Sequence, residues 1–257
     1  MVTKEGREQE CRASIKSFAR QSFNPKELIV VHDGPEHFHH ALSAIAATYP
    51  GTQIHLFAEP PEQSLGTLRN RSAALAGYPY ICQWDDDDLS HPARLTHQFG
   101  YLIKCGAEFC FMTDQLHLFV EQKQLFWDDW SVENYPGNLI QGTILGRRDL
   151  LGKYPDLPRG EDTELVFRLV QEGYKIASLS DYGWMYIYSY NGRNAWSLDH
   201  HKAISRWKRL NYDALKERLS LLEEKLPDYR LPYDKISMLH EKGKFEISLC
   251  NPSDQSR

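Results

Sequence analysis

The first half of the chain alternates between helical and strand-like patterns of hydrophobic residues. In its helical segments the apolar residues recur at helical spacing, and in the strands between them they run continuously. The pattern predicts helices over residues 8–21, 36–48 and 68–76, and strands over residues 27–31, 53–57 and 78–84. Strands and helices that alternate in this way form a mainly parallel sheet with helices on both faces. The first half therefore predicts an α/β, Rossmann-like fold.

The second half mixes the two patterns. Further strands are predicted over residues 109–113, 116–120, 124–127, 175–179 and 184–188. A helix with an apolar stripe is expected to begin near Glu161 and to end near Gly173. The chain is then expected to be helical over residues 200–225 and, after Pro227, polar and loosely packed.

Four consecutive aspartates, Asp85 to Asp88, follow the strand predicted over residues 78–84. Close carboxylates repel by about 1 kcal/mol per pair even in water, so packing alone does not explain them. A helix cap at Asp88 or Ser90 would explain one or two, whereas a divalent cation turns the repulsion into binding. Side chains alternate in an extended segment, so Asp85 and Asp87 are expected to share one face. Two hard oxygen ligands favour Mg²⁺ or Mn²⁺.

Two further polar residues are candidates for nucleotide binding. Asp33 follows the strand predicted over residues 27–31, where it fits either an Asp-Gly turn or a hydrogen bond to a nucleoside at the sheet's edge. Arg69 lies at a predicted helix start, where it is either solvated or bound to a phosphate or base through its forked guanidinium group.

Two other positions have a structural and a catalytic interpretation. Glu161 and Asp162 begin a predicted helix, so they either cap it or supply a carboxylate that takes a proton from a hydroxyl. His200 and His201 are adjacent at another helix start, where histidine is usually structural, although one imidazole would also suit a metal site.

Composition and charge narrow the classes of protein. The 257 residues are 41% hydrophobic, enough for a globular core in one large domain or two small ones. A net charge of −5 argues against nucleic-acid binding through a basic surface. No apolar run approaches a membrane span, and no signal-peptide core follows Met1. Five scattered cysteines without a CxxC pair favour a reducing, cytoplasmic environment.

The basic helical stretch over residues 202–218 also has two interpretations. Packing of its apolar stripe on the core is the favoured one. Its lysines and arginines would also fit peripheral contact with an anionic membrane surface.

Taken in chain order, several segments resemble the family 2 glycosyltransferases of the GT-A fold. Residues 85–92 (DDDDLSHP) match the spacing of the family's DxDD-x-x-x-P metal motif, and Gly160-Glu161-Asp162 resembles its ED motif. The other similar segments are residues 27–35 (the nucleotide-binding strand and its acidic end), residues 66–70 and residues 138–143. The resemblance covers roughly residues 1–200.

The resemblance implies a metal-dependent, inverting transferase that moves a sugar from a nucleotide-sugar, in particular a UDP-sugar, to a hydroxyl of a glycan or lipid-linked acceptor. The residues implied in donor binding are Thr3, Asp33, Arg69, Asp85 and Asp86. Those implied in holding Mg²⁺ or Mn²⁺ are Asp87, Asp85 and His200. Gln141 and Glu161 are implied in acceptor contacts, and Asp162 as the base.

The chain departs from the family pattern at its N-terminus. Only Met1-Val2-Thr3 stands where the family has a full first strand, and loss of a central strand is expected to expose its neighbours. We therefore expect a truncated first strand, a GT-A domain over residues 1–200, and a helical extension over residues 201–257 packed on it. The alternatives are a nucleotidyltransferase, which also uses aspartates and a metal, and a catalytically disabled relative that binds nucleotide-sugars.

Overall fold

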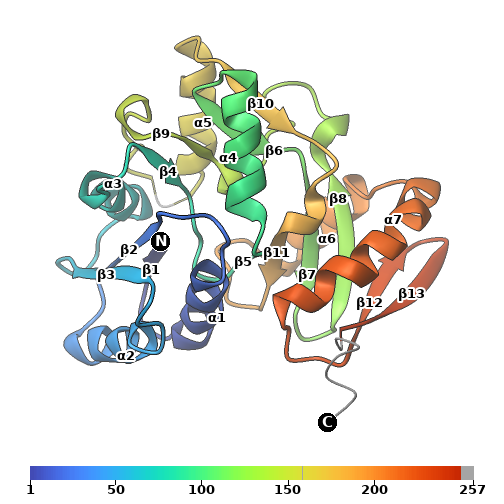
Figure 1. The fold of residues 1–257 in the computed structure, drawn as a ribbon, viewed down its shortest axis with the longest axis horizontal. Helices are drawn as coiled ribbons and strands as arrows, with labels where there is room; N and C mark the ends of the chain where they lie inside the picture. Colours follow the sequence, from blue (N-terminus) through green and yellow to red (C-terminus); the bar gives the residue numbers. More distant parts are fainter. Residues whose placement is uncertain (158, 250–257) are drawn as a thin grey trace.

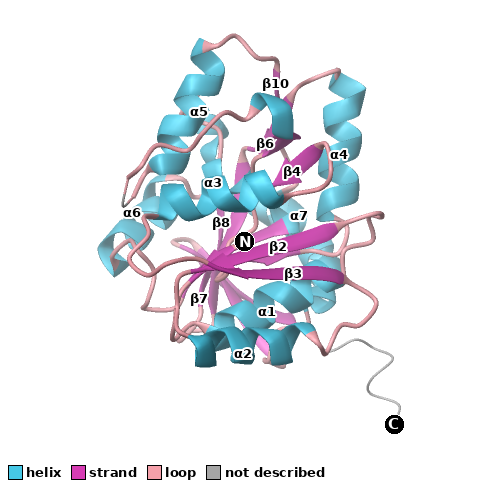
Figure 2. Cartoon of the chain, turned by 90° about the vertical axis from the view of Figure 1, so that its left-hand side faces the viewer, coloured by secondary structure: helices cyan, strands magenta, loops and turns pink. Residues whose placement is uncertain are grey.

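The computed structural model describes residues 1–157 and 159–249, and it begins with a three-stranded parallel sheet. Strand β2 (Glu27–His32) lies in the middle and pairs with β1 (Val2–Thr3) and β3 (Gln53–Ala58). Helices α1 (Glu8–Ala19) and α2 (Glu36–Ala46) lie on one side of this sheet, and α3 (Leu65–Leu75) lies on the other (Figure 2).

The side chains of β2 show why helices cover both faces of this sheet. Leu28 and Val30 belong to the large core that also contains residues of α1 and α2. Ile29 and Val31 alternate with them and pack against Leu68 of α3. Because successive strand residues point to opposite faces, a continuous apolar run needs a partner on each side. The α/β prediction for the first half is confirmed.

A second, four-stranded sheet continues the molecule in the order β10-β6-β9-β4. Strand β6 is parallel to β10, while β9 is antiparallel to both β6 and β4. The strands are β4 (Tyr80–Cys82), β6 (Phe109–Met112), β9 (Leu145–Arg147) and β10 (Ile176–Leu179), and the associated helices are α4 (Arg94–Cys105) and α5 (Glu161–Gln171).

The third sheet has six strands in the order β13-β12-β8-β7-β11-β5. Figure 1 shows its C-terminal hairpin, β12 and β13, on the opposite side of the molecule from β1–β3. The strands are β5 (Leu89–Ser90), β7 (Asp114–Phe119), β8 (Gln124–Asp129), β11 (Tyr186–Tyr190), β12 (Lys235–His240) and β13 (Gly243–Ser248). The remaining α-helices are α6 (Leu198–Trp207) and α7 (Tyr212–Lys225), and short 3-10 turns span Trp130–Val132, Gln141–Thr143, Arg148–Leu150, Gly183–Met185 and Leu226–Tyr229.

Three of the sequence-based expectations are wrong. The strand predicted over residues 78–84 is only β4, and its residues are half-buried. The helix predicted over residues 200–225 is two helices, because the backbone N–H of Leu210 bonds to the carbonyl of Trp127 and Asn211 caps a new helix. The tail after Pro227 is not loosely packed, since β12 and β13 form a hairpin with a buried face.

The described part of the chain contains no helix with the length and apolar character that a membrane span requires.

Candidate active site

The carboxyl ends of β1 and β2 lie side by side, because the two strands are parallel and Thr3 pairs with His32. Thr3 is buried, and its hydroxyl lies 2.9 Å from the thiol of Cys11. Asp33 is the first residue after β2, and its Oδ2 accepts a hydrogen bond of 3.1 Å from the backbone N–H of Gln63. Both predicted nucleoside contacts therefore lie at one edge of the sheet, where ligands bind in folds of this type.

Helix α1 fixes the loop that carries the four aspartates. The Ser14 hydroxyl donates to the backbone carbonyl of Asp85 (2.7 Å), and the indole N–H of Trp84 donates to the carbonyl of Ser14 (3.2 Å). Further along, Ser17 accepts a hydrogen bond from the backbone N–H of Ser90 (2.9 Å). The loop is therefore held on both sides of the aspartates.

The aspartates do not alternate between two faces. Asp85 pairs with Arg69 (Oδ1 to Nη2, 3.1 Å). Asp86 and Asp87 both bind the guanidinium group of Arg7, Asp86 at 3.3 Å. The alternation expected for an extended segment is lost because the chain bends at residues 86–87.

Asp88 lies apart from this charged group. Its carboxylate accepts hydrogen bonds from the Tyr186 hydroxyl and from the backbone N–H of Ser189 (2.9 Å), so it ties the aspartate loop to β11. Burial is the main cause that raises the pKa of Asp88 well above its usual range. The contacts of Asp88 are those of a structural residue.

Arg69 connects the aspartate loop to the start of α5. Its Nη2 binds Asp85 and its Nε lies 2.9 Å from Oε1 of Glu161, whose side chain is 2% exposed. Asp162 is the next residue, and its Oδ1 accepts a hydrogen bond of 2.8 Å from the backbone N–H of Thr163. Burial raises the pKa of both Asp162 and Glu161, and the charge of Arg69 opposes the rise. A raised pKa makes Asp162 a stronger base than an exposed aspartate.

The loop at residues 154–156 packs closely on α3, and this contact positions Arg69. The side chain of Asn70 donates to the carbonyl of Tyr154 (2.8 Å) and accepts from its N–H (2.7 Å). At Gly66 a Cβ atom would lie 2.0 Å from the carbonyl oxygen of Pro155. The guanidinium group of Arg69 then lies 5.6 Å from the ring centre of Tyr154.

Gln141 lies beside the same group of charges. It begins the 3-10 turn that contains Gly142, and a Cβ atom on Gly142 would come within 3.2 Å of Oδ2 of Asp85. The turn therefore lies next to Asp85. Because residue 142 is glycine, no side chain at that position covers the Asp85 carboxylate.

The charges at this site suit a divalent cation. Carboxylates at Asp85 to Asp87, Glu161 and Asp162 outnumber the guanidinium groups of Arg7 and Arg69. Burial, and then the charge of Asp87, raises the pKa of Asp86 to about 7. Oxygen donors with excess negative charge fit Mg²⁺ or Mn²⁺. Within the described residues, however, no three His, Cys, Asp or Glu side chains are arranged to hold a metal ion.

His200 is not brought to the aspartates by any contact in the structure. Its backbone N–H bonds to the hydroxyl of Ser197 (3.4 Å), and its ring stacks on Trp196 with centroids 4.4 Å apart. His201 is buried, and its Nδ1 lies 2.9 Å from Nε2 of His117. The contacts that the structure does show for the two histidines are structural.

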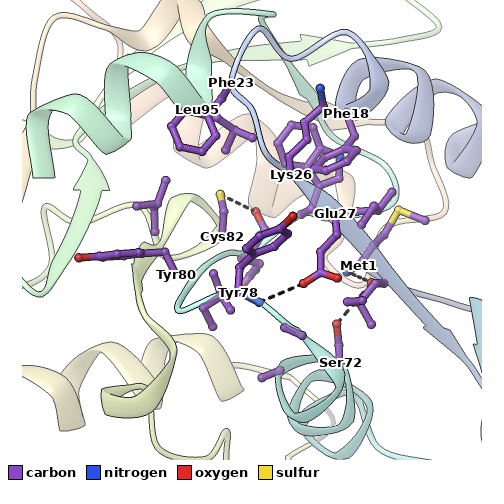
Figure 3. A pocket seen from close by; sticks show the side chains of 18 of the residues that line it. Met1, Phe18, Phe23, Lys26, Glu27, Ser72, Tyr78, Tyr80, Cys82 and Leu95 are labelled. Carbon is purple, nitrogen blue, oxygen red and sulfur yellow. Dashed lines mark hydrogen bonds between the residues drawn. The ribbon is translucent and has the colours of Figure 1, made fainter. Parts of the chain in front are cut away.

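An apolar cavity of about 290 Å³ lies between β2 and β4, and Arg69 is among the residues that line it. Figure 3 shows Met1, Glu27, Tyr78 and Cys82 around it. The N-terminal amine of Met1 donates to the carbonyl of Ile29 (2.7 Å), and burial lowers its pKa to about 5. Because the lining is mostly apolar, this cavity is a poor place for a charged donor, whose phosphates fit the aspartate side.

Comparison with protein families gives the site its context. Residues 1–114 match the family described as Glycosyl transferase family 2. The match covers 114 of the 257 residues, which is under half of the chain. The matched part includes Arg7, Arg69 and the four aspartates, whereas Glu161 and Asp162 lie beyond it. No curated protein sequence matches the chain.

Solved structures show that the chain has the GT-A fold of S. aureus TarS. Residues 1–349 of TarS in complex with UDP match with a TM-score of 0.60 at 17% identity, over 89% of this chain and 78% of that one. The same TarS fragment in complex with UDP-GlcNAc gives 0.57 at 15% identity, over 89% and 79%. A longer TarS structure gives 0.55 at 17% identity, over 89% of this chain and 47% of that one.

Sequence reasoning missed several residues that contact the aspartates. They include Arg7, Asn194 and Tyr186. Arg7 carries the clearest signal, because it follows the short first strand at the same edge of the sheet as Asp33. Asn194 and Tyr186 come from a distant part of the sequence, and only the fold brings them to the site.

Proposed function

We propose that this protein is a glycosyltransferase that moves a sugar from a UDP-sugar to a hydroxyl acceptor, with inversion at the anomeric carbon and with a divalent metal. The observation that carries the proposal is the ionic connection Asp85–Arg69–Glu161, which joins the aspartate loop to the helix that begins beside Asp162. It links the region suited to a diphosphate with the region suited to a base. The TarS structures with UDP and UDP-GlcNAc support a uridine nucleotide as the donor.

In this proposal Asp162 accepts the proton of the acceptor hydroxyl as that oxygen attacks the anomeric carbon. The new carbon–oxygen bond forms on the face opposite the bond to phosphate. That bond breaks, and its electron pair leaves with the nucleoside diphosphate. A single displacement inverts the anomeric configuration.

The other site residues hold the donor and the acceptor. Thr3 and Asp33 contact the nucleoside, and Asp86 contacts the donor sugar. Arg69 would neutralise the diphosphate, and its ion pair with Asp85 supports this assignment. Gln141 borders the acceptor. Glu161 is buried against Arg69. We therefore assign it the orientation of that arginine as its main role, and contact with the acceptor as a secondary one.

Asp85 and Asp87 would hold Mg²⁺ or Mn²⁺, which supplies charge neutralisation for the leaving diphosphate when bound. His200 remains only a sequence-based candidate, because it has no contact with these residues in the structure.

We also propose that the acceptor is a glycan or lipid-linked hydroxyl and that the enzyme works in the cytoplasm, in part against a membrane surface. Support comes from the free thiols of Cys11, Cys82, Cys105 and Cys110. At the end of α6, Trp207 is 71% exposed, and the guanidinium group of Arg206 lies 5.3 Å from the centre of its ring. An exposed tryptophan beside basic residues suits a membrane interface.

The Asp162→Asn variant tests the proposed base. Sugar transfer, measured as UDP release from UDP-GlcNAc with a panel of hydroxyl acceptors, should fall by on the order of 10²-fold or more because the proton acceptor is lost. UDP-GlcNAc binding, measured by calorimetry, should persist.

Glu164→Gln is the matched control, because Glu164 is exposed on the first turns of the same helix. It should change neither transfer nor binding. Loss of donor binding in Asp162→Asn would instead assign Asp162 a structural capping role. Release of pyrophosphate from UTP, without turnover of UDP-sugars, would favour a nucleotidyltransferase.

A further inference from the structure

Arg7 binds one carboxylate oxygen of Asp87, Oδ2. It stands at the start of α1, directly after Gly6, whose φ of +85° only glycine adopts without strain. Its Nη1 lies 3.3 Å from Oδ1 of Asp86, and its Nη2 binds Oδ2 of Asp87. The two side chains of the Arg7–Asp87 pair are only 15% and 14% exposed. The pair is therefore shielded from water but lies at the surface.

A second donor converges on the same oxygen. The amide of Asn194 donates to Oδ2 of Asp87 at 3.0 Å and to the carbonyl of Ser189 at 2.8 Å. Its neighbour Arg193 binds Glu10 on α1 and the carbonyl of Gly6 (2.7 Å). The turn that carries Asn194 is thus fastened to the helix start that carries Arg7.

These contacts conflict with metal binding at Asp87. A guanidinium group and a divalent cation repel each other, and both cannot bind one carboxylate oxygen closely. The Nε of Arg7 has no hydrogen-bond partner within the described residues, so the hydrogen-bonding capacity of its guanidinium group is only partly used. Because Arg7 lies at the edge of the core, its side chain can turn toward solvent without unpacking the buried residues of α1.

We propose that Arg7 competes with the divalent cation for Asp87, so that metal binds only when the guanidinium group has left this carboxylate. Arg7 is thus a determinant of metal affinity, and it keeps the aspartates neutralised when metal is absent. The inference rests on the metal part of the proposed function. It does not depend on Asp162 or on the identity of the sugar.

Mn²⁺ binding to the full chain without nucleotide tests the proposal, measured by the electron paramagnetic resonance signal of free Mn²⁺. Arg7→Ala should bind Mn²⁺ about tenfold more tightly than the wild type, because the competitor is gone. Asn194→Ala removes a neutral donor from the same oxygen and should show a smaller gain. Arg12→Ala is the charge-matched control, because Arg12 is exposed on α1. It should bind within about twofold of wild type at 0.15 M salt, where exposed charges are screened within roughly 8 Å.

Each outcome decides the matter. Unchanged or weaker Mn²⁺ binding in Arg7→Ala, with measurable binding in the wild type, overturns the competition and leaves the proposed function intact. Equal gains in Arg7→Ala and Arg12→Ala also overturn it, since net charge alone would then explain both. Absence of Mn²⁺ binding in every variant overturns both this inference and the metal requirement. Arg7→Gln, which keeps the length and polarity of the side chain, replaces Arg7→Ala if that variant fails to fold.

Discussion

At the scale of single residues, Gly66 shows how closely the arginine of the site is supported. A methyl group at this position would meet the backbone of Pro155 at 2.0 Å, and backbone cannot rotate away as a side-chain end can. We expect Gly66→Ala to push residues 154–156 from α3 and to strain the two hydrogen bonds between Asn70 and Tyr154. Overpacking of this kind costs roughly 1–3 kcal/mol. Thermal unfolding should show the loss, and UDP-GlcNAc binding should weaken because Arg69 shifts.

Gly100 provides the matched control for this substitution. It lies within α4 and has nothing within 4 Å of an added Cβ. Gly100→Ala should therefore stabilise the protein, by up to about 1 kcal/mol from helix propensity. If Gly66→Ala and Gly100→Ala behave alike, the close contact at Pro155 does not constrain the site.

Residues of the candidate site differed in how far the sequence could reveal them. Asp33, the aspartate run and Glu161 were singled out because they lie at the end of an apolar strand or at a helix start, where ligands bind in folds of this type. A turn or a helix cap explains Asp33 and Glu161 equally well from sequence alone. Their contacts could not be predicted. From sequence alone, an arginine such as Arg7 is usually interpreted as a solvated side chain. Only the bend at residues 86–87 brings two carboxylates to it.

At the scale of elements, a buried histidine pair joins α6 to the β7–β8 hairpin. Nδ1 of His117 lies 2.8 Å from Oδ2 of Asp128, and its Nε2 lies 2.9 Å from Nδ1 of His201. Burial, and then the charge of His117, lowers the pKa of His201 to about 3. An unfolded histidine titrates near pH 6.5, so between these values the unfolded state binds a proton that the folded state does not.

The sign of this difference predicts an acid-labile fold. The stability contributed by neutral His201 is complete above about pH 6.5 and falls as the pH drops, by about 1.4 kcal/mol per unit. His201→Gln should therefore lose less stability between pH 7.5 and 5.5 than the wild type, as measured by urea unfolding at both values. His40→Gln, an exposed position on α2, should keep the wild-type pH dependence. An equal drop in His201→Gln would contradict a buried neutral imidazole.

Elements of the first half could be predicted because each carries its own hydrophobic pattern. The hairpin β12–β13 was missed, although Ile236 and Met238 alternate with polar residues as in a half-buried strand, because the pattern is short and lies within a polar segment. Its buried residues Ile236 and Met238 face a core only because β12 pairs with β8. A separate long-range contact with β8, the bridge between Arg209 and Asp128, lies where the helix predicted over residues 200–225 is interrupted.

At the scale of the whole molecule, the apolar cavity separates the sheet β1–β3 from the sheet that begins with β4. Strand β1 has only two residues, which pair with Val31 and His32 of β2. If that parallel register were continued toward the N-terminus, added residues would lie beside Ile29, Leu28 and Glu27. All three of these residues line the cavity, and Figure 3 labels Glu27 among them. A strand placed there would replace the buried amine of Met1 with a peptide bond and would fill the space.

This geometry predicts that an added strand stabilises the whole molecule. A variant with Met-Val-Ile-Val-Ile fused ahead of Met1 should extend β1 through the cavity, since apolar β-branched residues favour strands. Each side chain that becomes fully buried contributes roughly 1.5–3 kcal/mol, and each kcal/mol raises the Tm by roughly 2–4 °C for a chain of this size. The melting temperature of the variant should therefore rise by several degrees. A Met-Gly-Ser-Gly-Ser extension of equal length is the control and should give no rise, because it buries no apolar side chains. A gain with both extensions would mean that removal of the buried amine is sufficient, and no gain with either would show that the cavity does not accept a strand.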